Sequence, residues 1–355
     1  MVVQVIGAGP SGSVAAISAV RENHKVNLYE EHPTSGIPVN CSGLISKEGL
    51  ESLRDLVDYR KHSFHKLRGA IIDCAGTKLK IDSEKDIAYL INRASFDAAL
   101  AAKAEEEGAK LHYNRRMAAP FPEGHIIGAD GPNSTVAEHF GFPNIERFVG
   151  TSQASVSYDG EMPEFVRVFL SNDKFPGFFA WLIPQNKDHA ELGAGCILPQ
   201  NPNKALEALA KELGATLPQK KSHAIIPVAQ RSRCSHFSPS GNVLLVGDAA
   251  GQVKSTTGGG VVFGTKCARI AAKNISTPKN YEREWRAACG KDLDTHFHLH
   301  KSLGSLNDEA LAAFGSLAST FKIEEFLRRS GNMDTPTQML GAELLLHPLR
   351  SLVDK

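Results

Sequence analysis

The stretch VVQVIGAGPSGSVAAISAVRENHKVNLYE, residues 2–30, decides the fold. It opens with a β-branched run, turns at GAGPSG, continues as an Ala-rich segment that predicts a helix over 13–23, and resumes a strand at KVNLYE. This order is a βαβ unit. Gly7 permits the tight turn, Gly9 lets the backbone approach a pyrophosphate, and Gly12 lets the helix lie close to the strand. The start of the helix then offers free N–H groups to phosphates.

Glu30 closes the second strand, at about the spacing expected for an acid that binds a ribose diol. A carboxylate at this position favours an adenosine ribose without a 2′-phosphate, as in FAD or NAD. Strand, glycines, helix, strand and acid follow one another in the required order. The sequence therefore favours a dinucleotide site over a purely structural turn.

Length and composition describe an ordinary globular protein. The 355 residues suggest about two domains, and 42% are hydrophobic while 22% are charged. Forty basic residues balance 39 acidic ones, so we expect no nucleic-acid partner. Six cysteines without a CxxC pair indicate reduced thiols and no zinc site. With no signal peptide and no apolar segment of about 18 residues, we expect a cytoplasmic protein whose membrane contact is at most peripheral.

The chain alternates between two kinds of segment. Strand, Gly-containing turn and helix recur at HIIGADGPNSTVAEHFG (125–141), and a buried strand ends in Gly-Asp at GNVLLVGDAAG (241–251). Between them, strand-like runs such as SQASVSY, FVRVFL and HAIIPV surround one helix near 204–213. Helices are also predicted over 47–57 and within INRASFDAALAAKAEEEGAKL (91–111), the latter with Ser95 as its candidate cap and Gly108 as its end.

These patterns predict an α/β protein with three parts. A discontinuous Rossmann-like dinucleotide-binding domain comprises 1–66, 93–150 and 239–287. A β-sheet domain that binds substrate, made of 67–92 and 151–238, is inserted into it. A helical region, 288–355, completes the chain, and within it the apolar MLGAELLLHPLRSLV predicts a docked helix.

Later motifs distinguish a flavin from a nicotinamide. GADG (128–131), GDAAG (247–251) and STTGGG (255–260) follow the first unit, and Arg93 opens the segment RASFDAAL. With these motifs the chain resembles the flavoprotein monooxygenase-like superfamily, which has the p-hydroxybenzoate hydroxylase fold. The resemblance implies one bound FAD, with the three glycines of the first motif at the pyrophosphate, Glu30 at the ribose, Arg93 beneath the cofactor and Asp248 at the ribityl chain. It also places these residues against FAD: Cys41, Asp130, Gly131, Gly247, Gly258, Gly259 and Gly260.

Physical chemistry agrees with these roles. An Asp just after a strand can accept hydrogen bonds from polyol hydroxyls. Consecutive glycines at a helix start let N–H groups face the pyrimidine edge of the flavin, where the helix dipole stabilises negative charge near N1 of the reduced ring.

Two further segments indicate a branch of this superfamily. PVNCSGLIS (38–46) and FPGFFAWLIP (175–184), the latter followed by AELGAGC, resemble the hallmarks of the geranylgeranyl reductase family. The first is a Cys-x-Gly loop near the flavin and the second an aromatic substrate motif. The resemblance runs from Val2 to about Arg286. The Gly-Asp region departs from the family because it lacks the family's proline, and Lys254 and Ser255 lie in its neighbourhood.

The resemblance makes Cys41 the candidate catalytic residue, because a thiol over the flavin can gate its conformation or relay a proton. A small buried packing residue is the alternative. Aromatic side chains of the substrate motif are candidates to wall an apolar cavity for a polyprenyl chain, with plain core packing as the alternative: Phe175, Phe178, Phe179 and Trp181. For HFHLH (296–300) no metal site is predicted, because helical spacing leaves only His296 and His300 on one face.

Three functions remain open. The resemblance favours an FAD-dependent reductase that saturates C=C bonds of geranylgeranyl or polyprenyl lipids. An FAD-dependent monooxygenase or halogenase acting on a hydrophobic substrate has the same fold, and a flavin-binding redox protein without turnover is the third. The sequence names no electron donor: NAD(P)H or a protein such as ferredoxin is equally compatible. It also leaves open the proton donor, the lipid headgroup, the number of bonds reduced and the oligomeric state.

Overall fold

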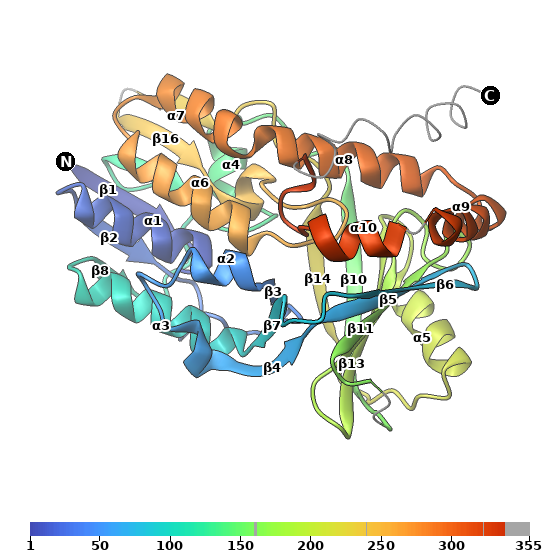
Figure 1. Cartoon of the computed structure of the whole chain (residues 1–355). Coiled ribbons are helices and arrows are strands. Elements are labelled where there is room, and N and C mark those ends of the chain that lie inside the picture. Colours follow the sequence, from blue (N-terminus) through green and yellow to red (C-terminus); the bar gives the residue numbers. More distant parts are fainter. Residues whose placement is uncertain (160–161, 239, 322, 338–355) are drawn as a thin grey trace.

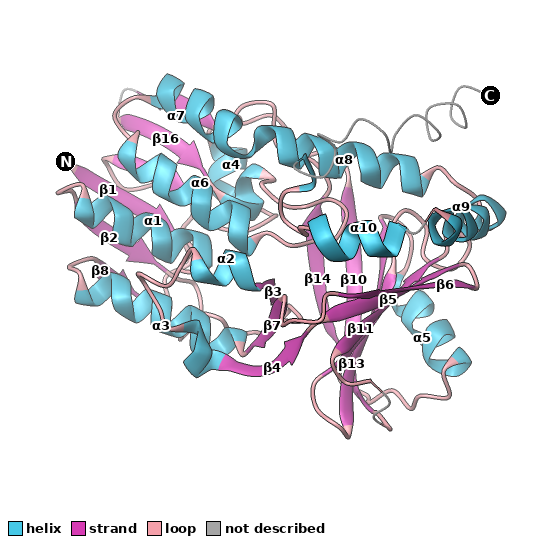
Figure 2. Ribbon diagram, viewed as in Figure 1, coloured by secondary structure: helices cyan, strands magenta, loops and turns pink. Residues whose placement is uncertain are grey.

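The computed structural model describes residues 1–159, 162–238, 240–321 and 323–337. Its first sheet has six strands in the order β15–β16–β9–β1–β2–β8. The strands are parallel except β15, which pairs antiparallel with β16. Their bounds are β1 Val2–Ile6, β2 Lys25–Tyr29, β8 Lys110–His112, β9 His125–Gly128, β15 Ser235–Ser238 and β16 Gly241–Leu245. The α/β class and the FAD-binding type of fold predicted from the sequence are confirmed (Figures 1 and 2).

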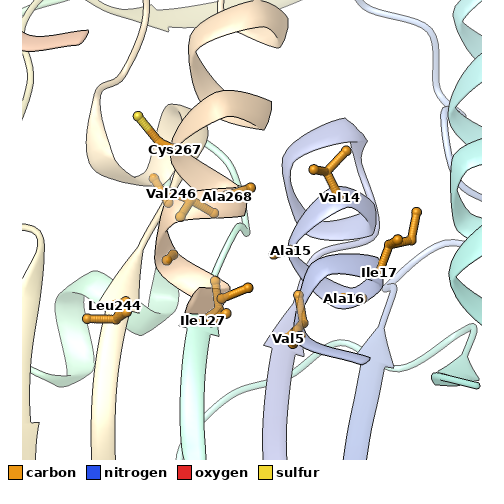
Figure 3. Packing of buried hydrophobic residues seen from close by; sticks show 14 of the residues in the cluster. Val5, Val14, Ala15, Ala16, Ile17, Ile127, Leu244, Val246, Cys267 and Ala268 are labelled. Carbon is orange, nitrogen blue, oxygen red and sulfur yellow. The ribbon is translucent and has the colours of Figure 1, made fainter. Parts of the chain in front are cut away.

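Helices α1, α3, α4, α6 and α7 accompany the first sheet, with bounds Pro10–Arg21, Arg93–Glu106, Thr135–His139, Val261–Lys273 and Pro278–Trp285. Figure 3 shows how Val5 of β1, Ile17 of α1 and Ala268 of α6 share one apolar core, in which all three are fully buried. Helix α1 begins three residues before the predicted start because Pro10 fits the first helical position. In α3 the predicted cap is wrong: Asn92 caps the helix by accepting a hydrogen bond from the Ser95 N–H, at 3.1 Å.

The second sheet has seven strands in the order β14–β10–β13–β12–β11–β5–β6. All neighbours are antiparallel except β11 and β5. The bounds are β5 Gly69–Cys74, β6 Thr77–Asp82, β10 Phe148–Ser157, β11 Phe165–Leu170, β12 Ala180–Pro184, β13 His189–Ile197 and β14 Ser222–Pro227. Helix α5 (Pro202–Glu212) covers one face, close to the helix predicted at 204–213.

A small third sheet, β3–β7–β4, lies between the two larger ones (Figure 1). Its strands are β3 Leu44–Ser46, β4 Ser63–Leu67 and β7 Ala88–Ile91, so the end of the 67–92 segment pairs here rather than with the second sheet. The helix predicted over 47–57 is shorter: α2 is Lys47–Glu51. The chain continues in tight turns, which bury Leu53, Leu56 and Val57 together against the core.

Helices form the end of the described chain. Helix α8 (Lys291–Gly304) follows α7 and extends toward the second sheet, and α9 (Asp308–Thr320) lies beyond its end. Helix α10 (Ile323–Ser330) turns back below α8, next to β6 (Figure 1). The helix predicted within 339–353 lies outside the described residues. Within the described ranges, no helix is both long enough and apolar enough to cross a membrane.

Candidate functional site

The carboxyl ends of four parallel strands place the predicted cofactor residues at one edge of the first sheet. Gly7 follows β1, Glu30 follows β2, Asp130 follows β9 and Asp248 follows β16. Strand β1 has β2 on one side and β9 on the other, so the chain connections diverge there. In open α/β sheets ligands bind in the crevice at such a point.

The glycines of the first turn have two different roles. Gly7 has φ +97°, and a Cβ atom there would lie 2.4 Å from the Ala129 carbonyl oxygen. A Cβ at Gly12 would lie 1.7 Å from the Gly7 carbonyl oxygen, so both glycines are required by packing. A Cβ at Gly9 would meet no atom within 4 Å. The protein does not need glycine at that position for its own packing, which leaves room for the close approach of a ligand.

Two helix starts lie close together beside this turn. Helices α1 and α6 begin at the caps Gly9 and Gly260, and neither start has a capping side chain or an acidic residue in its first turn. The two helices touch through Ser11, whose Oγ would lie 2.6 Å from a Cβ at Gly247 and 2.3 Å from one at Gly264. Uncapped helix N-termini are suited to the negative charge of a pyrophosphate and of a reduced flavin.

Glu30 is 8% exposed, and its side chain is hydrogen-bonded to the backbone of the turn after β1. Its Oε2 accepts from the Ala8 N–H at 3.0 Å, and its Oε1 accepts from the His32 N–H at 3.1 Å and lies 2.8 Å from His32 Nδ1. A carboxylate has about four acceptor positions. Lone pairs therefore remain on Glu30 for the hydroxyls of a ribose.

The side chain of Asp130 stabilises the turn after β9. Its carboxylate accepts from Ser134 Oγ at 2.6 Å, from Thr135 Oγ1 at 3.1 Å and from the Val136 N–H at 3.1 Å. The next residue, Gly131, has φ +79°, and a Cβ there would meet no atom within 4 Å. The Asp130 side chain thus fixes the loop, and the backbone at Gly131 stays open.

The Gly-rich loop 254–260 leads from the turn after β16 into α6 and contacts the second sheet. A Cβ at Gly260 would lie 2.6 Å from Oδ1 of Asp248, and one at Gly258 (φ +73°) would lie 2.7 Å from Cδ1 of Ile226 and 3.6 Å from Cζ of Phe178. Burial raises the pKa of Asp248 to about 6, against the opposing charge of Arg93. Asp248 is therefore placed to bind hydroxyl groups in either protonation state.

A cavity of about 490 Å³ opens beside these residues. It brings together the predicted residues Cys41, Arg93 and Asp248, which come from three distant parts of the chain. The remaining lining residues are Gly36, Pro38, Val39, Asn40, Asp97, Pro132, Asn133, His223, Ala224 and Ile225.

Arg93 is anchored from its own helix. Its guanidinium forms two hydrogen bonds with Asp97, at 2.8 and 2.7 Å, and its side chain is 14% exposed. Burial acts to lower the pKa of Arg93, but the negative charge of Asp97 and the interaction with the Cys41 side chain outweigh it and raise the pKa. Sequence reasoning missed Asp97, although its i, i+4 spacing from Arg93 on a helix is the available signal.

Cys41 is exposed, whereas the other five cysteines are buried. Its Sγ accepts from the Gly43 N–H at 3.4 Å. Gly43 has φ +74° and packs against the Ile91 carbonyl, which ties the Cys41 loop to β7. The thiol therefore lines an open cavity beside a guanidinium rather than filling a gap in the core.

The structure separates the four candidate aromatic residues. Phe178, Phe179 and Trp181 pack together on the face of the second sheet that meets β7 and α8, with ring centroids 4.3 Å apart for the first pair and 5.7 Å for the second. Phe175 is 1% exposed and packs on the opposite face, against α5. Glycines on β13 make room for the first group: a Cβ at Gly193 would lie 2.2 Å from the Trp181 ring, and one at Gly195 would lie 2.4 Å from the Phe178 ring.

Glu191 lies on this aromatic face and was not predicted. Trp181 Nε1 donates to Glu191 Oε1 at 3.1 Å, and burial raises the pKa of Glu191 to about 7, opposed by that hydrogen bond. Strand alternation, which puts Glu191 on the same face as Gly193 and Gly195, is the signal that could have found it.

His296 and His300 both lie on helix α8, but their side chains have different contacts. His296 is buried with Nδ1 2.7 Å from Thr256 Oγ1, while His300 contacts Phe178 at 6.3 Å between ring centroids. Within the described part of the chain, no group of three or more His, Cys, Asp or Glu side chains is arranged to hold a metal.

Comparisons with known proteins agree with this geometry. The pattern of the FAD binding domain family matches residues 1–277. Digeranylgeranylglycerophospholipid reductase of Methanosphaerula palustris is 27% identical, covering 91% of both chains, and digeranylgeranylglycerophospholipid reductase 1 of Methanopyrus kandleri is 28% identical, covering 94% of this chain and 98% of its own. A solved geranylgeranyl bacteriochlorophyll reductase-like protein from Thermoplasma acidophilum superimposes with a TM-score of 0.80 at 20% identity, over 99% and 98% of the two chains. The resemblance stated from the motifs is confirmed.

Proposed function

This chain belongs to the FAD binding domain family, and from that premise we propose that it is an FAD-dependent reductase that saturates C=C bonds of geranylgeranyl or related polyprenyl chains in isoprenoid lipids. One observation carries the proposal. The Gly-rich loop expected to face the flavin touches the aromatic face of the second sheet at Gly258, through Ile226 and Phe178. A cofactor cradle and an apolar wall thus meet at one point. The names of the two archaeal reductases support the same substrate class.

The uncapped starts of α1 and α6, the open space at Gly9 and the free lone pairs of Glu30 fit an FAD molecule. FAD, when bound and reduced, supplies a hydride to one carbon of the double bond. The other carbon needs a proton, which we assign to the Cys41 thiol in the cavity. Arg93 stabilises the thiolate that remains, and Asp97 holds Arg93 in place. Hydride and proton together convert C=C to a saturated bond.

Phe178, Phe179 and Trp181 provide the wall for the polyprenyl chain in this proposal. A saturated or unsaturated hydrocarbon chain offers only apolar area for recognition, about 0.8 kcal/mol for each buried CH₂. Phe175, on the other face of the sheet, is left to the core. Because such a lipid resides in a bilayer, the proposal includes peripheral contact with a membrane surface during loading.

The reductant completes the proposal. The single βαβ fingerprint in the sequence is assigned to FAD in this proposal, so a nicotinamide must bind transiently or a carrier protein such as ferredoxin must deliver the electrons. Both donors reduce the flavin before the lipid is reduced.

Mass spectrometry tests the function. Dithionite-reduced holoprotein, incubated under argon with a digeranylgeranyl glycerophospholipid, is expected to produce lipids heavier in steps of two hydrogens. An unchanged lipid under argon, together with reductant-dependent oxygen consumption and an oxygenated or halogenated product in a parallel incubation in air, would establish the monooxygenase or halogenase instead. A flavin that no reductant bleaches would establish the redox-binding protein.

A further inference from the structure

A buried ion pair lies beneath the Gly-rich loop. Lys254 Nζ is 2.6 Å from Asp334 Oδ1 and 3.2 Å from the Met333 carbonyl oxygen, and both charged residues are only 5% exposed. The second carboxylate oxygen of Asp334 accepts from Ser46 Oγ. Burying such a pair costs desolvation of two charges, so it is weak as a device for stability alone. Its position indicates another role.

Lys254 is part of the loop that it supports. Its carbonyl accepts from the Gly258 N–H at 2.8 Å, and its N–H donates to the Gly259 carbonyl at 3.2 Å. A Cβ at Gly259 would lie 2.6 Å from Lys254 Cε and 3.2 Å from Nζ. The ammonium group is therefore in contact with the backbone that leads into the start of α6.

The titratable groups around this pair are either neutral or hydrogen-bonded to other residues. His296, which faces Lys254, is neutral near pH 7 because burial and the charge of Lys254 lower its pKa to about 4. Asp292 accepts from Thr337 Oγ1 at 2.5 Å, and Glu48 accepts from Asn332 Nδ2 at 2.5 Å. These contacts dock the 331–337 segment on α2 and α8, so that the segment brings the Asp334 carboxylate to Lys254.

We propose that the Lys254–Asp334 pair sets the reduction potential of the bound FAD. Lys254 places a positive charge under the flavin-facing loop, and the carboxylate of Asp334 partly neutralises that charge. The inference rests on the cofactor part of the proposed function and not on the lipid substrate. A reduced flavin carries more negative charge than an oxidised one, so an uncompensated ammonium group stabilises the reduced form and an uncompensated carboxylate destabilises it.

The test is the midpoint potential of the holoprotein, measured by dye-equilibrated reduction under argon. Asp334→Asn is expected to raise the potential and Lys254→Met to lower it, each by a tenfold change in the reduction equilibrium, which is about 30 mV for two electrons. The double variant K254M/D334N is expected to return toward the native value. Glu212→Gln, which removes the exposed partner of Lys174, is the control and should change nothing.

Shifts of the same sign in both single variants, or no shift, would overturn the proposal and leave the pair with a structural role. If Asp334→Asn does not fold, Asp334→Glu, which keeps the charge, must retain the native potential and Lys254→Met must still lower it. Failure of the native protein to bind FAD would refute the cofactor assignment itself, and loss of lipid reduction at a normal potential would refute only the lipid substrate.

Discussion

Glu30 joins the backbone of the first turn to the expected ribose site. Its carboxylate accepts from the Ala8 N–H and retains lone pairs for hydroxyl groups. We expect Glu30→Lys to weaken FAD binding by about 1–3 kcal/mol, because hydrogen bonds to a charged group are lost and a positive charge replaces it. Fluorescence titration of the apoprotein with FAD measures the effect. Glu31→Lys, a charge reversal at the half-exposed neighbour, is the control, and equal affinities of the two variants would contradict the groove assignment.

Cys41 differs from the other cysteines because it is exposed and faces the cavity. Cys41→Ala should therefore leave the melting temperature and the yellow colour unchanged, while lipid reduction falls by the roughly 10²–10⁴-fold typical of a lost proton donor. Cys74→Ala, at a buried cysteine, should do the reverse: stability falls by about 1 kcal/mol and the rate per folded molecule persists. An unchanged rate in Cys41→Ala would remove Cys41 from the reaction.

At the scale of elements, strand β13 makes room for the aromatic face because it carries glycines where side chains would meet the rings. Gly193→Ala would place a methyl group 2.2 Å from the Trp181 ring. We expect a loss of about 1–3 kcal/mol in the free energy of unfolding and weaker lipid binding, because the ring must move. Denaturant unfolding and lipid binding measured by Trp fluorescence provide the two readouts. Gly290→Ala, where the nearest atom would be 3.5 Å away, should change neither, and a fully tolerated Gly193→Ala would contradict this packing.

Glu191 on the same strand makes the free energy of unfolding depend on pH. Burial raises the pKa of Glu191 from 4.5 to about 7, so the folded state binds the proton more tightly than the unfolded state. The resulting stability is present below about pH 4.5 and is lost as the pH rises toward 7, on the order of 3 kcal/mol. Glu191→Gln should remove this contribution, so that denaturant unfolding measured at pH 5 and pH 8 shows a smaller decline than in the native protein. Glu207→Gln, at an exposed residue of α5, should decline as the native protein does; parallel curves for Glu191→Gln would contradict the assignment.

Elements were predictable where local pattern and packing agree. The βαβ unit was predicted because its glycines are demanded by contacts within the unit itself, as at Gly12. Helix α2 was overestimated because the burial of Leu53 and Leu56 by turns depends on the core that they meet. The separation of Phe175 from Phe178 could not be predicted, because the loop before β12 decides which face each ring joins.

At the scale of the whole molecule, the candidate site assembles from segments that are distant in sequence. The family resemblance implied that Cys41, Arg93 and Asp248 lie against one FAD, and the structure brings these three residues together in one cavity. The Lys254–Asp334 pair carries no local pattern, since its partners are 80 residues apart and meet only through the docking of the chain end. Tertiary ion pairs of this kind are properties of the fold and lie beyond motif reasoning.

Anaerobic reoxidation of the reduced holoprotein tests the central claim most directly. Flavin is reduced photochemically under argon, and a digeranylgeranyl glycerophospholipid is added while the absorbance of oxidised flavin is followed. The account predicts that the yellow absorbance returns without oxygen, with one flavin reoxidised for each double bond saturated. A flavin that stays reduced with the lipid present, and is reoxidised only when air is admitted, would contradict the assignment as a lipid C=C reductase.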